Sequence, residues 1–137
     1  MAIKILKAEY YYTSVHDQPG EAYKLLEQLE IMGINLLAFT AIPMGNERTQ
    51  FTLFPEDTND LLQAAENAGF TLDGPHAALL VHGDDELGAL TDLHRKLYQA
   101  NVNVYTSSGV TDGKGSFGYV VYIRAEEMDK AVSALGI

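Results

Sequence analysis

The chain contains no cysteine, and this absence excludes several classes of site at once. Without thiols there is no disulfide scaffold, no cysteine nucleophile and no zinc or iron–sulfur site built on cysteine. The sequence also lacks a run of ~18 uncharged apolar residues, which a membrane helix needs, and the apolar segment of a signal peptide. We therefore expect a soluble, unprocessed, cytoplasmic protein that does not enter the membrane.

Positive charge is also scarce. Nine Lys and Arg face nineteen Asp and Glu, so the formal net charge is −10. A surface of this sign repels polyphosphate backbones and anionic lipid. The composition therefore argues against nucleic acid and membranes as partners.

What the chain does have is the composition and length of a folded domain. It has 137 residues, 47% of them hydrophobic. Folding at this length buries roughly two-thirds of the surface of the unfolded chain, so no metal or cross-link is required for stability.

The sequence repeats itself after 68 residues, which is almost half its length. Within each half, short apolar runs and segments of helical periodicity follow the order strand, helix, strand, strand, helix. The shift aligns these pairs: Gly20 with Gly88, Leu25 with Leu93, Leu29 with Leu97, and Asn35 with Asn103.

The predicted elements have definite limits. Strands are expected at residues 8–15, 34–42 and 48–54 of the first copy and at 77–82, 102–108 and 117–123 of the second, with helices at 22–32, 61–68, 89–100 and 128–135. Gly33 and Asn101 are expected to end the first helix of each copy in the left-handed conformation.

A fourth strand completes each copy. Residues 70–72 provide it in the first copy, whereas the second copy ends with nothing to cover its edge. Shifted by 68 residues, Ala2 to Leu6 fall on that position, so we predict that this N-terminal segment closes the second copy, with Ile3 and Ile5 on one face.

Two turn motifs carry a resemblance to a known family. Asp17-Gln-Pro-Gly20 precedes Gly33-Ile34-Asn35 by thirteen residues, and Asp85-Glu-Leu-Gly88 precedes Asn101-Val102-Asn103 by the same spacing. The chain thus resembles a stand-alone tandem ACT protein. The resemblance implies an α+β fold of two ferredoxin-like βαββαβ repeats side by side, 1–74 and 75–137, with an antiparallel sheet and helices on one face.

The resemblance also implies a function. ACT domains commonly bind amino acids and regulate metabolic enzymes, with ligands between adjacent domains. The turn of one copy would then face the Ile34-Asn35 or Val102-Asn103 edge of another.

The turn residues suit this chemistry. The Pro19-Gly20 pair presents the first helical amides, at Glu21 and Ala22, to a carboxylate. Asp17 can accept from an ammonium group. The candidate ligand-binding residues are Asp17, Pro19, Gly20, Glu21, Ala22, Ile34 and Asn35 in the first copy, and Asp85, Leu87, Gly88, Ala89, Val102 and Asn103 in the second.

The same residue types also serve as ordinary helix caps and turns, so a purely structural role remains an alternative. The second turn has Leu87 in place of proline, and three adjacent acids, 84–86, would repel a carboxylate.

Other motifs are interpreted structurally. Residues 113–118 fit GxGxxG but lead into a strand, which indicates a hairpin and not a dinucleotide site. The four histidines lack metal-ligand spacing, and the tyrosines at 10–12 suit packing on both sheet faces. No nucleophile or tuned acid stands out, so we expect neither an enzyme nor a cofactor nor a metal.

Three functions are therefore compared: an amino-acid-binding regulator, a regulatory subunit that docks on an enzyme without its own ligand, and a vicinal-oxygen-chelate metalloenzyme, which needs His and Glu ligands.

We also expect a homodimer. The reason is the uncovered face of the expected eight-stranded sheet, to which we assign Tyr10, Tyr12, Phe39, Phe51 and Tyr119.

Overall fold

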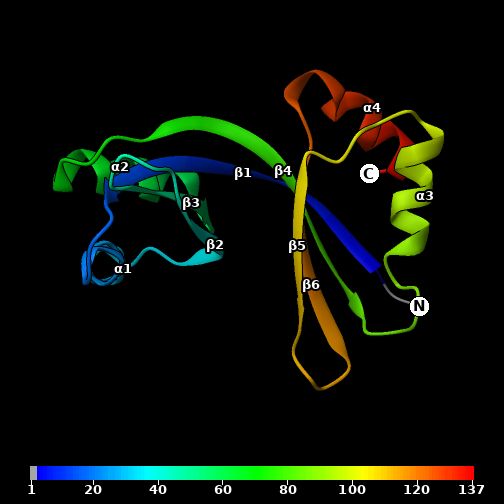
Figure 1. The fold of residues 1–137 in the computed structure, drawn as a ribbon, viewed down its shortest axis with the longest axis horizontal. Helices are drawn as coiled ribbons and strands as arrows, with labels where there is room; N and C mark the ends of the chain where they lie inside the picture. Colours follow the sequence, from blue (N-terminus) through cyan, green and yellow to red (C-terminus); the bar gives the residue numbers. More distant parts are fainter. Residues whose placement is uncertain (1–2) are drawn as a thin grey trace. The chain divides into compact units, whose positions relative to one another are not determined.

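The computed structural model describes residues 3–137 and contains six strands and four helices (Figure 1). This confirms the predicted α+β class with an antiparallel sheet. The strands are β1 (Ile3–His16), β2 (Leu36–Pro43), β3 (Arg48–Pro55), β4 (Asp73–Asp84), β5 (Thr106–Thr111) and β6 (Ser116–Tyr122); the helices are α1 (Glu21–Ile31), α2 (Thr58–Ala68), α3 (Thr91–Gln99) and α4 (Ala125–Leu135).

The contacts divide the chain into two compact units. One is Glu9–His76, and the other consists of Ala77–Ile137 together with the N-terminal residues up to Ala8. The first holds eleven acidic and two basic side chains and the second eight and seven, so nearly all of the net charge lies in the first. We call them the acidic unit and the C-terminal unit.

Two long strands contribute to both units. β1 begins in the C-terminal unit and ends in the acidic unit, and β4 does the reverse. The strand order is β2-β3-β1-β4 in the acidic unit and β1-β4-β6-β5 in the C-terminal unit. The expectation of eight strands is therefore wrong, because two strands of 14 and 12 residues each take the place of two short ones.

The described N-terminal residues pack in the C-terminal unit, as the 68-residue repeat predicts. Ile3 and Ile5 contact the hydrophobic core of the C-terminal unit, while Lys4 and Leu6, on the alternate positions, are exposed. Ala2, the first residue of the predicted closing strand, lies outside the described residues.

In the acidic unit, one face of the sheet is covered by α1 and α2. Leucines at three- and four-residue helical spacing meet alternate residues of β1 and β3, as an amphipathic helix on a half-buried sheet requires. The buried cluster consists of Tyr11, Leu25, Leu29, Phe51, Leu53 and Leu61, with Phe39 packed against it.

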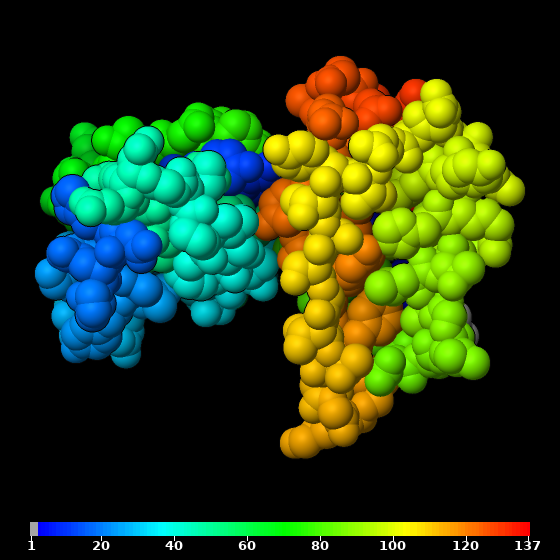
Figure 2. Space-filling view, viewed as in Figure 1, coloured from blue at the N-terminus to red at the C-terminus, as the bar shows by residue number. Residues whose placement is uncertain are grey.

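The C-terminal unit has the same layering. Leu93 and Leu97 of α3 and Met128 and Ala131 of α4 cover alternate residues of the sheet. The sheet side of this core consists of Leu79, Val81, Phe117, Tyr119 and Val121. Beyond the helices, the β5–β6 hairpin projects as a yellow-to-orange finger (Figure 2).

The predicted composition of the uncovered sheet face is therefore wrong in part. Phe39, Phe51 and Tyr119 lie under the helices and not on the other side. Only Tyr10 and Tyr12 point away from the acidic unit's core, because they alternate with the core residue Tyr11.

The ends of the first helices are as predicted. Gly33 and Asn101 both adopt left-handed backbone, with φ of 74° and 59°. In each case the next amide donates to the carbonyl of a buried leucine, Ile34 to Leu29 at 2.8 Å and Val102 to Leu97 at 2.9 Å.

Several element limits differ from the expectation; α2 and α4, for example, each begin three residues earlier than predicted. Residues 70–72 are not a strand, since the fourth strand of the acidic unit is the start of β4 at Asp73. Helix α3 begins at Thr91, so Ala89 and Leu90 belong to the turn before it. β5 begins at Thr106, where its pairing with Tyr122 of β6 begins.

Candidate functional site

In the first predicted turn, two side chains hydrogen-bond to each other. Gly20 has a φ of 90°, and α1 starts at the next residue without a side-chain cap. Gln18 donates from Nε2 to Oε1 of Glu21 at 2.6 Å, and the amide of Glu21 reaches the carbonyl of Gln18 at 3.4 Å. The start of the helix therefore already carries a carboxylate, that of Glu21.

The edge expected to face this turn lies in a different hollow of the acidic unit. Ile34 and Asn35 line a depression of about 430 Å³ beside Leu26 and Leu36. Asn35 donates from Nδ2 to Oε2 of Glu56 at 2.8 Å, and its carbonyl accepts from the amide of the same residue at 2.9 Å. None of the candidate residues of the first turn lines this depression.

The second turn lines a hollow of its own. Asp85, Gly88 and Ala89 border a space of about 500 Å³ with the β5–β6 hairpin. Leu87 is fully exposed. Val102 is a core residue and Asn103 is exposed, and neither lines this space.

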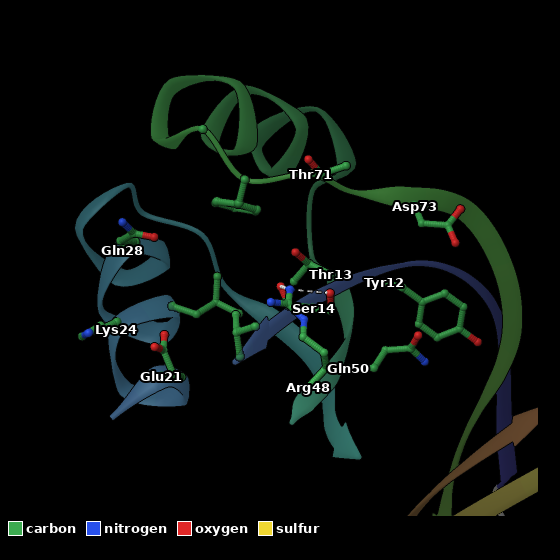
Figure 3. A pocket seen from close by; sticks show the side chains of 14 residues that line it. Tyr12, Thr13, Ser14, Glu21, Lys24, Gln28, Arg48, Gln50, Thr71 and Asp73 are labelled. Carbon is green, nitrogen blue, oxygen red and sulfur yellow. Dashed lines mark hydrogen bonds between the residues drawn. The ribbon is translucent and has the colours of Figure 1, made fainter. Parts of the chain in front are cut away.

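A groove of about 720 Å³ lies in the acidic unit (Figure 3). Glu21 lines it, and it is the one predicted site residue that does. The lining residues come from the end of β1, the helix α1, the start of β3 and the segment before β4: Tyr12, Thr13, Ser14, Val15, Glu21, Lys24, Leu25, Gln28, Arg48, Gln50, Gly69, Phe70, Thr71 and Asp73.

The groove exists because β1 is longer than its neighbour. β1 pairs with β3 as far as His16, whereas β4 begins at Asp73 and the residues before it leave the sheet. Thr13, Ser14 and Val15 are thereby left to line a space between this strand end and the segment 69–73.

Arg48 is fixed within this groove. It stands opposite His16 in the β1–β3 register, and its side chain extends along β1. Its Nη2 donates to the carbonyl and to Oγ of Ser14, at 3.0 and 2.9 Å, and Nη1 lies 3.5 Å from Nδ1 of His16. A guanidinium held in this way is preorganised for a ligand.

The groove contains the positive charge of the acidic unit. Lys24 and Arg48 are the two basic residues of the acidic unit, and both line it. Among residues 3–137, no carboxylate forms an ion pair with either of them. The sequence contained one signal for this: Arg48 is the only Lys or Arg between residues 25 and 94.

The glycine-rich segment forms the predicted hairpin. Asp112 accepts from the amides of Lys114 and Ser116 at 2.7 and 3.1 Å across the turn between β5 and β6. These backbone hydrogen bonds hold the pKa of Asp112 below its ordinary value.

The histidines have separate surroundings. His94 shares a hydrogen bond of 2.7 Å with Oη of Tyr119, and His76 lies beside the rings of Tyr10 and Tyr12. In the described part of the chain, no group of three or more His, Asp or Glu is arranged to hold a metal ion. No helix there is long and apolar enough to span a membrane.

The fold is shared with solved structures along nearly the whole chain. BT0572 from Bacteroides thetaiotaomicron superposes with a TM-score of 0.80 at 16% identity, over 96% of this chain and 88% of that one. Aspartokinase α and β subunits give 0.65 at 18% identity, over 98% and 95%. The regulatory subunit of aspartate kinase from Thermus flavus gives 0.58 at 19%, over 98% and 94%.

These likenesses establish an ACT-type fold. The sequence matches no protein-family model, and it matches no curated protein.

Proposed function

We propose that the protein is a regulatory protein that senses a small metabolite, an amino acid, and modulates a metabolic enzyme or pathway. The observation that carries this proposal is the fold, which over 98% of the chain is that of the regulatory subunit of aspartate kinase from Thermus flavus. That subunit is a regulatory part and not a catalytic one, which also fits a protein that is not an enzyme.

We propose further that the sequence consists of two ACT repeats, 1–74 and 75–137, and that the start of β1 completes the sheet of the second repeat. The matched helix ends at Gly33 and Asn101, which stand 68 positions apart, support this division. So does the shared strand order, in which each unit has four strands and two covering helices.

The turns remain the proposed ligand contacts. Asp17 would accept from the ammonium group, and the amides after Gly20 and Gly88 would approach the carboxylate. The hollow that Asp85, Gly88 and Ala89 border supports the second of these sites.

The first turn is tested by measuring amino-acid binding to an Asp17 variant by calorimetry. Asp17→Ala removes an exposed acceptor and should weaken amino-acid binding by about 1.5–3 kcal/mol, the value of a charge-assisted hydrogen bond. Glu66→Ala, which removes an exposed carboxylate from α2, is the control and should bind as the unaltered protein does. Equal affinity in the two variants would remove Asp17 from the site.

A docking role without a ligand is the second candidate, because the acidic unit exposes large apolar side chains. Tyr23, Ile31, Leu37, Ile42 and Met44 are 46–77% exposed. Such a surface suits a second copy of the chain or a regulated enzyme. We propose a homodimer, which light scattering at tens of micromolar, about the range of a stable interface, would detect.

A further inference from the structure

We propose that the groove around Arg48 binds a small zwitterion that carries a carboxylate and an ammonium group, the chemical class of free amino acids, with the carboxylate on Arg48. This inference rests on the proposed function, because it places a ligand of the sensor in a definite groove. It differs from the sequence-based expectation, in which helix amides receive the carboxylate.

The first argument is the placement of positive charge. The acidic unit holds eleven carboxylates and two basic side chains, yet both basic side chains line one groove and neither has a carboxylate partner among the described residues. In a chain with such an excess of acid, two cations that line one concavity without a carboxylate partner mark a place for an anion.

The second argument is the geometry of Arg48. A guanidinium has five N–H donors in a planar fork, which matches the two oxygens of a carboxylate. Two of its contacts go to Ser14 and a longer one to His16, so the fork is held in position while further donors remain. The side chain loses little freedom when a ligand arrives.

The third argument concerns the other end of the ligand. Glu21 from α1 and Asp73 from β4 also line the groove, and Figure 3 shows Arg48 between them. A purely anionic ligand would be repelled by both carboxylates, whereas an ammonium group would be attracted.

The C-terminal unit lacks the two basic residues at the equivalent positions. At positions 68 residues further on, Ser116 takes the place of Arg48 and Asp92 that of Lys24. The amide of Ser116 is bonded to Asp112. The Arg48 site is therefore expected once per chain.

The test is two-dimensional NMR of the intact chain with each of the twenty amino acids, and with acetate and methylamine as the two halves of a zwitterion. Arg48→Gln is compared with Lys114→Gln, which removes the same charge from the exposed β5–β6 turn. Arg48→Lys keeps the charge but loses the fork. The spectra themselves report whether each variant is folded.

At least one amino acid should shift the amides of Ser14 and Thr71 in the unaltered chain and in Lys114→Gln, with one site per chain. Affinity should fall about 10- to 100-fold in Arg48→Gln, the fold-change of a lost charge-assisted hydrogen bond, and less in Arg48→Lys. Acetate and methylamine alone should shift neither amide at the same concentration.

Unchanged affinity in Arg48→Gln, or acetate binding as tightly as the amino acid, would overturn the inference. Shifts confined to residues 17–22 would also overturn it and would leave the proposed sensor function standing. No shift anywhere with any amino acid would contradict both.

Discussion

Ile5 offers a sharp test of how the N-terminal strand is used. The residue precedes the acidic unit in sequence but packs in the core of the C-terminal unit. Full truncation of a core isoleucine to alanine costs about 2–5 kcal/mol, and Ile5 is only partly buried, so Ile5→Ala should lower the free energy of unfolding by about 1–3 kcal/mol. Leu6→Ala, at a neighbouring position that is 45% exposed, should cost less than about 1 kcal/mol.

The assay combines urea unfolding with hydrogen exchange resolved by segment. In Ile5→Ala, exchange should rise first in α3 and α4, which cover the core that Ile5 contacts, and later in α1 and α2. A cost for Leu6→Ala equal to that for Ile5→Ala would refute the reasoning. Faster exchange in α1 and α2 before α3 and α4 would refute it as well.

Two further predictions concern the C-terminal unit. A Cβ at Gly109 would lie 2.8 Å from Cδ1 of the buried Tyr119, so Gly109→Ala should destabilise the fold by about 1–3 kcal/mol in chemical unfolding; an unchanged midpoint would show that the ring moves freely. The pKa of Asp112 is lowered in the folded state, so its stabilising effect is present above the ordinary carboxyl pKa of about 4 and is lost as the pH falls through the lower folded value. The stability difference between the unaltered chain and Asp112→Ala should therefore be larger at neutral pH than in strong acid, and a difference independent of pH would contradict the role of the carboxylate.

Local sequence signals predicted much of the fold because they depend on nearest neighbours. Helix periodicity places Leu25 and Leu29 under the sheet, and the left-handed ends at Gly33 and Asn101 follow from the few residues that tolerate positive φ. The strand–helix–strand–strand–helix order follows from the same local rules.

The lengths of the strands were harder to predict. Gly74 and Pro75 are typical turn residues, and the expected strand began only at residue 77, yet β4 runs through them. Glycine is suited to position 74 because a Cβ there would lie 2.8 Å from the ring of Tyr11, a contact that only the folded sheet creates. A tertiary contact thus favours glycine near the start of this strand.

The groove could not be predicted from local pattern at all. Arg48 and Ser14 are 34 positions apart and meet only through the β1–β3 register. The space beside them depends on where β4 begins relative to the end of β1. The isolation of Arg48 among acidic residues was visible in the sequence, but its neighbours were not.

The central claim is that this protein binds an amino acid, and a thermal-shift screen of the unaltered chain against the twenty amino acids tests it most directly. A ligand that binds only the folded state stabilises it by about 2.7 kcal/mol at 100 times its Kd. At least one amino acid should therefore raise the melting temperature, and the rise should grow with concentration. A melting temperature that stays constant with every amino acid at millimolar concentration would contradict the claim.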